Sequence, residues 1–359
     1  MSSSLLVPIV QLENVRAHTN ADSLELCDVL GYQMVIPKGK YKNGDVCVYF
    51  PADTLLPAEL GDSLGVRNYL RGPDKDRVGR VRLRGEPSFG LLSSVPGDAG
   101  FVVGDNAADY FGCKKYIPPI KVTAGDAIAY DSEVDPFIER YTDIENGRLF
   151  TNVFAEGEEV IVTEKIHGTN TKIGFVKTST GIQYVAGSMS LRRKMPNTKD
   201  GERLQDNKYW FPMSLDGVAS LLRQFEDLDA RSVILYGEVY GGSIQSMNYG
   251  LQKGRGLGFR AFDLMVDGKY LDFDKFISLC ETHSVPVVPV LYQGAFSLAK
   301  IKELAEGDST IPGAKHIKEG VVVKPVIERT DVKIGRAVLK YISTSYDFSK
   351  YKDEDTTDC

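Results

Sequence analysis

Short apolar runs separated by turn residues occupy the first part of the chain. Residues 7–12, 24–30, 46–50, 80–83 and 89–92 have the length and composition of β-strands, and Gly, Asn and Asp lie between them. Several short strands in so few residues predict a small β-barrel over residues 1–112.

Apolar and basic residues alternate at residues 78–85. Successive side chains of a strand point to opposite faces, so Arg80, Arg82 and Arg84 are expected to share one face. Such a face suits the phosphates of a nucleic acid. A run of charges is also typical of a solvated surface, and this alternative stays open.

Proline and glycine interrupt residues 113–158, which we expect to form a connector packed on a second domain, with a short helix at 137–141. Residues 159–346 combine helical patterns at 215–228 and 273–283 with strand-like runs at 161–163, 233–240, 258–266, 320–324 and 337–342. This predicts an α+β domain of antiparallel sheets with flanking helices. The acidic tail at 347–359 is expected to be disordered.

Composition narrows the class of protein. The chain has 359 residues, of which 42% are hydrophobic and 26% charged, enough for two ordinary folded domains. There is no signal-peptide pattern and no run near the roughly 18 apolar residues of a membrane span, so we expect an intracellular protein without a membrane partner. The five cysteines have neither zinc-site nor disulfide spacing.

The net charge of -6 means that a nucleic-acid partner would have to meet a local basic surface. Besides the arginines at 80–84, basic residues gather in two further places. They are Arg192, Arg193, Lys194 and Lys199 in one run, and Lys253, Arg255 and Arg260 in another.

Charged residues end or interrupt several of the apolar runs in the second domain. Lys165 follows the β-branched run at 161–163 and is flanked by Glu164 and His167. The other charged residues in buried runs are Glu238, Asp263, Glu319, Lys324 and Lys340. Because burying an unpaired charge is costly, so many cases in one domain indicate a site.

This set of residues meets the needs of nucleotidyl transfer. A lysine attacks phosphorus only when neutral, which partial burial and the nearby cations Lys324 and Lys340 would favour. Glu238 and Glu319 supply the oxygen ligands that magnesium prefers, often through its water molecules. Phe262 could stack on a purine, although a strand phenylalanine is more often part of a core.

The motifs resemble those of ATP-dependent RNA ligases. Residues 165–170, Lys-Ile-His-Gly-Thr-Asn, are similar to their nucleotidyltransferase motif I. DNA ligases and capping enzymes more often have Lys-x-Asp-Gly, so His167 is the residue that distinguishes RNA ligases from them. Arg192 or Arg193, Glu238, Phe262-Asp263, residues 319–324 and Lys340 follow in the order of the later motifs. Residues 18–24, 41–49 and 83–92 resemble the OB-fold modules of tRNA-binding proteins.

The whole chain resembles the RNA ligase family typified by the Deinococcus radiodurans enzyme. The resemblance implies that Lys165 takes AMP from ATP with Mg²⁺ or Mn²⁺, and that the enzyme seals nicks in RNA or RNA/DNA duplexes with an RNA 3′-OH end. We expect the protein to be a monomer. The resemblance also implies nucleotide contacts from Glu164, Gly168 and Asn170, and a 5′-phosphate contact from Arg192, Arg193 or Lys194.

Two features depart from relatives of this family. Only nineteen residues follow Lys340, so the N-terminal module would have to hold the substrate. Many relatives have two lysines, spaced Lys-x-Lys, in the last motif. In this chain the first position is Lys340 and the second is Ile342. Two alternatives remain open, namely another covalent nucleotidyltransferase and a non-catalytic OB-fold protein that binds RNA.

Overall fold

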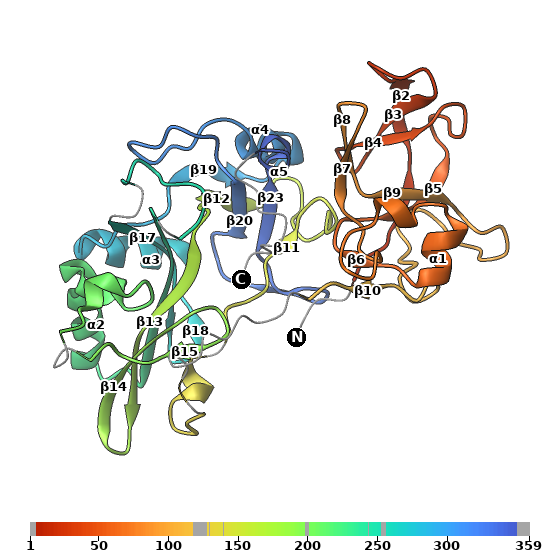
Figure 1. Cartoon of the computed structure of the whole chain (residues 1–359). Coiled ribbons are helices and arrows are strands. Elements are labelled where there is room, and N and C mark those ends of the chain that lie inside the picture. The colour runs from red at the N-terminus through yellow and green to blue at the C-terminus, as the bar shows by residue number, and fades with distance from the viewer. Residues whose placement is uncertain are drawn as a thin grey trace. The chain divides into compact units, whose positions relative to one another are not determined.

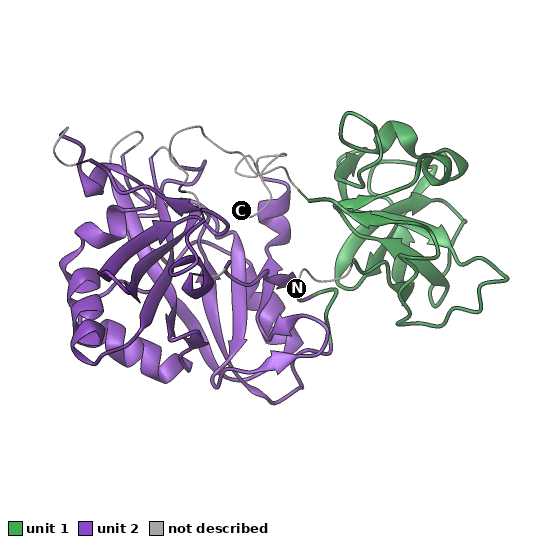
Figure 2. Ribbon diagram, turned by 90° about the horizontal axis from the view of Figure 1, so that it is seen from below, with its two compact units in different colours: residues 1–119, 148–151 green, residues 120–147, 152–359 purple. Residues whose placement is uncertain are grey.

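The computed structural model divides the chain into two compact units (Figure 2). One comprises residues 1–119 and 148–151, and the other comprises residues 120–147 and 152–359. The structure describes residues 5–117, 128, 130–138, 140–197, 201–242, 244–252 and 256–349. Lys199, Lys253, Arg255 and residues 350–359 of the expected acidic tail lie outside the described residues.

The first unit is built from short antiparallel strands (Figure 1). β1 (Ile9–Gln11), β5 (Val46–Phe50) and β9 (Leu91–Ser94) form one sheet, and β2 (Glu13–Ala17), β3 (Leu24–Val29) and β4 (Tyr32–Pro37) form another. β7 (Arg80–Leu83) pairs with β8 (Glu86–Phe89), and β6 (Thr54–Leu55) with β10 (Lys114–Lys115). The helices are α1 (Ala58–Ser63) and the 3-10 turn η1 (Arg67–Tyr69). The buried core includes Ile9, Val48, Phe50 and Val78.

Two turns in the first unit correct the expected strands. The expected strand at 89–92 is two strands, because Gly90 between β8 and β9 has a φ of +122° and a Cβ there would lie 2.6 Å from the Phe50 carbonyl oxygen. The expected strand at 24–30 ends one residue early, at Val29. Leu30 and Gly31 have φ values of +52° and +78° and turn the chain into β4, which the apolar pattern did not predict.

The second unit contains two larger sheets. The six-stranded sheet has the order β15 (Arg192–Arg193), β14 (Gly181–Gly187), β13 (Thr169–Thr178), β16 (Ser232–Gly241), β17 (Leu257–Val266) and β18 (Lys269–Tyr270). The five-stranded sheet has the order β11 (Glu145–Asn146), β23 (Leu339–Ile342), β20 (Gly320–Pro325), β12 (Glu159–Lys165) and β19 (Val290–Ala295). β21 (Thr330–Asp331) pairs with β22 (Gly335–Arg336). All described pairs are antiparallel except β11 with β23, which is parallel.

Helices flank these sheets. They are α2 (Asp216–Asp227), α3 (Phe273–Thr282), α4 (Leu298–Ala305), α5 (Thr344–Asp347) and the 3-10 turns η2 (Asp135–Phe137), η4 (Leu204–Asp206) and η5 (Phe211–Ser214). The apolar sides of α2 and α3 pack on one face of the six-stranded sheet, where Leu221 and Phe276 join Phe175 and Phe259 in one core. Ile161 of β12 enters the same core, which links the two sheets. The expected α+β fold is confirmed.

Part of the connector packs on the other face of the six-stranded sheet, whereas residues 113–117 belong to the first unit, where β10 pairs with β6. Val134, Ile138 and Tyr141 pack there against Ile234 and Tyr236 of β16. The expected helix at 137–141 is wrong, because among the described residues of this segment the chain makes only the turn η2 and leaves the helical region at Ile138, with φ and ψ of -117° and 45°.

The expected strand at 337–342 begins later, at Leu339. The Val338 N–H donates to the Arg336 carbonyl at 2.8 Å, so a tight turn separates β22 from β23. Among the described helices, none is long and apolar enough to cross a membrane.

Candidate active site

Lys165 is the last residue of β12, and its side chain is held by a glutamate from far along the chain. The Nζ atom donates a hydrogen bond to Oε1 of Glu319 at 2.8 Å. The Lys165 side chain is 14% exposed and that of Glu319 is 3% exposed. The lysine is therefore partly buried beside a carboxylate, at the point where an interior strand of the five-stranded sheet ends.

The register of the five-stranded sheet places three lysines on one face. Ile161, four residues before Lys165, pairs with Lys324 of β20. Val322, two residues before Lys324, pairs with Lys340 of β23. Directly paired residues share a face, and so do residues two or four apart along a strand. Lys165, Lys324 and Lys340 therefore line the same side of the sheet.

His167 is fixed in place by two tyrosines. The backbone N–H of His167 donates to the Tyr249 hydroxyl at 2.6 Å, and Nδ1 lies 3.2 Å from the Tyr346 hydroxyl. Burial raises the pKa of Tyr249 well above its ordinary value, so this phenol stays neutral. Nδ1 of His167 also lies 3.4 Å from Oε2 of Glu319. The two tyrosines that orient the histidine were not expected from the sequence, whereas Glu319 was.

Two buried atoms beside Lys165 have no hydrogen-bond partner among the described residues. They are Nε2 of His167 and Oε2 of Glu319. Buried polar atoms are normally paired, so a bound group that supplies a donor to Oε2 or a partner to Nε2 would complete this site. A phosphate oxygen suits a ring N–H, and a hard cation suits the carboxylate oxygen.

Glu238 lies beside the turn that follows Lys165. Its Oε1 accepts a hydrogen bond from the Gly168 N–H at 3.0 Å, and its backbone pairs with Asn170 across β13 and β16. A Cβ on Gly168 would lie 2.3 Å from the Val239 carbonyl oxygen, so this position requires glycine. The two glutamates expected to hold a metal thus flank residues 165–168, with Glu319 at one end and Glu238 at the other.

The donor set suits a weakly held divalent cation rather than a protein-enclosed one. In the described part of the chain, no group of three or more His, Cys, Asp or Glu side chains is placed to hold a metal ion. Mg²⁺ commonly binds through one or two carboxylates plus water and substrate phosphates. Glu238 and Glu319 fit that mode of binding.

Glu164 points away from Lys165, because neighbouring residues of a strand face opposite sides. Its carboxylate accepts hydrogen bonds from the Ser309 hydroxyl at 2.5 Å and from the N–H and hydroxyl of Thr310 at 2.7 Å each. The residue is only 1% exposed. In this structure Glu164 ties β12 to the loop after α4, and this loop was not expected to take part in the site.

Phe262 sits at a β-bulge. Tyr236 pairs with Asp263 and Gly237 pairs with Ala261, so Phe262 has no partner in β16. A bulge redirects a side chain, and Phe262 packs against the cluster that contains Ile166, whereas Phe259 lies in the core under the helices. The Phe262 ring also makes an edge contact with Tyr141 of the connector, with ring centroids 5.2 Å apart, so Phe262 packs against both the cluster of Ile166 and that of Tyr141.

Lys324 is engaged within the protein. Its Nζ donates to Oδ1 of Asp263 at 2.5 Å and to the Phe262 carbonyl oxygen at 2.8 Å, and its side chain is 5% exposed. Two of the three N–H donors of this ammonium are therefore committed to Asp263 and Phe262.

Of the basic residues at 192–194, Arg192 shares a face with Glu238. Across the sheet, Gly187 of β14 pairs with Arg192 on one side and with Lys172 on the other. Lys172 lies two residues from Asn170, which pairs with Glu238. Paired residues and residues two apart share a face, so Arg192 and Glu238 do as well. Arg192 forms a 3.3 Å ion pair with Asp135 of the connector. Arg192 is thus the arginine on the side of the sheet where the glutamate lies.

Arg193 faces the opposite side. It pairs with Ala186, which belongs to the core under α2 and α3. Its guanidinium lies over the Tyr209 ring at 4.8 Å, and its carbonyl oxygen accepts a hydrogen bond from the Trp210 indole N–H at 3.2 Å. Lys194 is exposed beyond the end of β15. The structure therefore separates three residues that the sequence could not rank.

In the first unit, Arg80 and Arg82 lie two residues apart in β7 and share a face, as expected. Arg84 lies beyond the strand, in a turn where its φ is +51°. Arg82 is exposed, and it donates to the Gly85 carbonyl oxygen at 3.0 Å within this hairpin. Arg84 is therefore not part of the alternating face that the sequence predicted.

Comparisons with known proteins agree with this geometry. The model of the RNA ligase family matches residues 158–342, more than half of the 359 residues, and a model of an OB-fold domain matches residues 6–95. No curated protein matches the chain.

Solved structures of the Naegleria gruberi RNA ligase are similar over almost the whole chain. A variant with ATP and Mn has a TM-score of 0.70 at 23% identity, covering 98% of this chain and 100% of that one. The enzyme with PPi has a TM-score of 0.66 at 24% identity, covering 95% and 97%. A variant with AMP and Mn has a TM-score of 0.68 at 23% identity, covering 95% and 98%. At this identity the likeness shows the fold.

Fold and site together define an OB-fold module joined to a nucleotidyltransferase domain. The match of the family model over residues 158–342 makes the assignment specific: this chain belongs to the RNA ligase family.

Proposed function

We propose that this chain is an ATP-dependent RNA ligase that joins a 3′-OH to a 5′-phosphate at nicks in duplexes with an RNA 3′-end. The observation that carries the proposal is the placement of Lys165, partly buried against Glu319 and on one sheet face with Lys324 and Lys340. Family membership and the likeness to a ligase solved with ATP and Mn support the choice of nucleotide and metal.

In the first reaction, Nζ of Lys165 attacks the α-phosphorus of ATP. The N–P bond forms, the bond to the leaving pyrophosphate breaks, and the lysine loses a proton. Glu319 at 2.8 Å favours the ammonium form of Lys165 over the amine. Attack therefore requires the charge of Glu319 to be met by another cation. Mg²⁺ or Mn²⁺ held by Glu319 and Glu238 would supply that charge and offset the charge of the phosphates.

The residues around Lys165 orient the reacting groups. Nε2 of His167 is positioned by the Tyr249 and Tyr346 contacts and faces no described partner, so it is free to bind a phosphate oxygen. Lys340 and Lys324 lie on the same sheet face and can balance charge as it develops on the α-phosphate. Phe262, redirected by its bulge, is the candidate for stacking on adenine.

The next two reactions consume the lysyl-AMP. An oxygen of the RNA 5′-phosphate attacks the phosphorus and releases Lys165, and the 3′-OH then attacks the activated 5′-phosphorus and expels AMP. Arg192, on the same face as Glu238, is the candidate for binding the 5′-phosphate. Arg80 and Arg82 of the OB-fold module are candidates for binding the duplex backbone.

Nick sealing tests the proposed substrate. Duplexes that differ only in the sugar at the 3′-terminus are offered to the enzyme under single-turnover conditions with ATP and Mg²⁺. We expect rapid sealing with a ribose and slow sealing with a deoxyribose at that position. Equal rates with both sugars would contradict the proposed preference, and sealing with GTP but not ATP would contradict the proposed nucleotide.

A further inference from the structure

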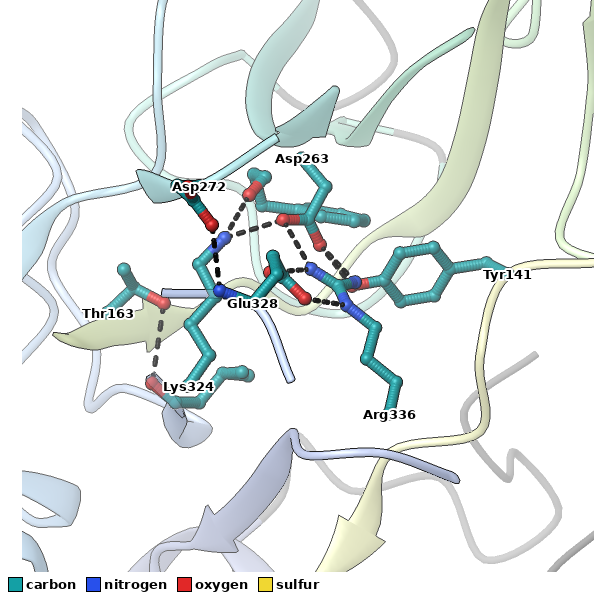
Figure 3. Close-up of polar contacts among 9 residues, drawn as sticks. Tyr141, Thr163, Asp263, Asp272, Lys324, Glu328 and Arg336 are labelled. Atoms are coloured by element: carbon teal, nitrogen blue, oxygen red, sulfur yellow. Dashed lines mark hydrogen bonds and ion pairs between the residues drawn. The ribbon is translucent and has the colours of Figure 1, made fainter. Parts of the chain in front are cut away.

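Asp263 lies at the centre of a buried charge network that connects the two large sheets of the second unit (Figure 3). Its carboxylate accepts hydrogen bonds from Lys324 of β20, from Arg336 of β22 and from the Tyr141 hydroxyl of the connector. Burial alone would raise the pKa of Asp263, but the charges of Arg336 and Lys324 outweigh it and hold that pKa well below its usual range. The carboxylate is therefore ionised.

Arg336 is fixed along every edge of its guanidinium. Nη1 and Nη2 donate to the two oxygens of Asp263 at 2.7 and 2.9 Å, and Nε donates to Glu328 at 2.8 Å. Nη1 also reaches the Tyr141 hydroxyl at 3.1 Å, and Nη2 reaches Glu328 at 2.5 Å. These contacts use all five donors of an arginine. The group also lies over the Tyr270 ring at 3.7 Å.

Lys324 is held less completely. Its two hydrogen bonds go to Oδ1 of Asp263, which Arg336 also binds, and to the Phe262 carbonyl oxygen. An ammonium on a flexible stem can change partners more readily than a guanidinium with five fixed contacts. Lys324 also shares its sheet face with Lys165.

We propose that Arg336 is a positioning residue that holds the charge of Asp263, so that Lys324 can leave Asp263 for a phosphate of bound ATP. This inference rests on the proposed function. The exchange breaks the hydrogen bond from Nζ to Oδ1 and forms one from Nζ to a phosphate oxygen, with no covalent change. Asp263 keeps its two bonds from Arg336 and the one from Tyr141 throughout.

Asp263 and Glu328, the two carboxylates that bind Arg336, differ in exposure, and this difference explains why Asp263 needs Arg336 when Lys324 leaves. The Asp263 side chain is 3% exposed, so losing its last cation would leave a buried, unpaired charge. The Glu328 side chain is 15% exposed and can draw on water. Without Arg336, Lys324 would be the remaining cation for Asp263 and would be retained there.

Single-turnover transfer of AMP from saturating ATP to Lys165 tests this assignment, with thermal unfolding followed in parallel. The variants are R336M, D263N, R336M/D263N, K324A and K324A/R336M. Arg329→Met serves as the matched control, because Arg329 pairs with Glu158 outside the network. We expect R336M to react about as slowly as K324A, and the control to react like the unmodified protein.

Removing the charge of Asp263 should release Lys324 again. We therefore expect R336M/D263N to react at least about tenfold faster than R336M. In the K324A background, R336M should slow the reaction by less than about threefold, because the two residues act through one interaction. If R336M does not fold, the neutral variants R336Q and R336Q/D263N are compared in its place, and the double variant must again be the faster.

Two outcomes separate the assignment from the proposed function. No AMP transfer to the unmodified protein would contradict the proposed function, and this inference with it. If the unmodified protein does transfer AMP, either of two results would show a purely structural role for Arg336. In the first, R336M/D263N reacts as slowly as R336M. In the second, R336M slows the reaction as much in the K324A background as it does alone.

Discussion

Oε1 of Glu319 accepts a hydrogen bond from Nζ of Lys165 at 2.8 Å, although the two residues are 154 positions apart in the chain. The pair joins the end of β12 to the start of β20, and the second oxygen of Glu319 has no hydrogen bond among the described residues. Under the proposed function, one carboxylate thus restrains the nucleophile and offers an oxygen to a cation. We therefore expect the charge of Glu319 to matter strongly to the first reaction.

Glu319→Gln should slow AMP transfer to Lys165 by about a hundredfold or more, because the amide keeps the shape but lacks the charge that binds a metal. Quenched-flow labelling with α-labelled ATP measures the rate. Glu303→Gln is the control, since Glu303 pairs with Lys300 on the exposed side of α4. An E319Q rate within a few-fold of the unmodified protein would remove Glu319 from the reaction.

We expect the buried side chain of Lys172 to make folding stability depend on pH. Burial lowers the pKa of Lys172 to about 8 from 10.5, so the folded state binds this proton less tightly than the unfolded state. The resulting cost, roughly 3 kcal/mol at pH 7, disappears as pH rises from about 8 to above 10. Relative to the unmodified protein, Lys172→Met should therefore gain most in free energy of unfolding at pH 7 and progressively less towards pH 10.

Urea unfolding at several pH values checks this prediction. Lys177→Met is the control, because Lys177 lies on the same strand with a side chain 27% exposed, paired with Asp229. A difference between K172M and the unmodified protein that does not change with pH would mean that Lys172 is not a source of pH-dependent stability.

Arg82→Ala should weaken binding to a nicked duplex and reduce the slope of log K against log salt concentration by about 0.9 for the phosphate contact it loses. Salt titrations followed by fluorescence anisotropy measure the slope. Arg67→Ala removes the same charge from the same unit, where Arg67 pairs with Asp62, and should leave the slope unchanged. Equal slopes for R82A and the unmodified protein would place the RNA elsewhere.

The sequence predicted those parts of the fold that local patterns determine. The β-branched run before Lys165 is an interior strand, and the spacing of Val218, Leu221 and Leu222 marks the buried side of α2. Turns were harder. Gly90 adopts a positive φ where the Phe50 carbonyl oxygen comes close, and Leu30 adopts one in the turn between β3 and β4. A strand that looks continuous in the pattern is therefore divided where another backbone approaches.

The residues around the site that were not predicted have no local signal. Tyr249 and Tyr346 orient His167 from segments far away in the chain, and Thr310 binds Glu164 from a loop. Arg336 looks like one more basic residue until the fold places it beside Asp263. Lys165 itself could be singled out because its neighbours in sequence form a motif.

The most direct measurement is the identity of the lysine that carries AMP. The protein is incubated with α-labelled ATP and Mg²⁺, digested, and mapped by mass spectrometry. We predict AMP on Lys165, no label on Lys165→Ala, and release of the label as AMP when nicked RNA is added. Label on Lys172, a lysine whose pKa burial lowers to about 8, or no label on the folded protein, would contradict the central role of Lys165.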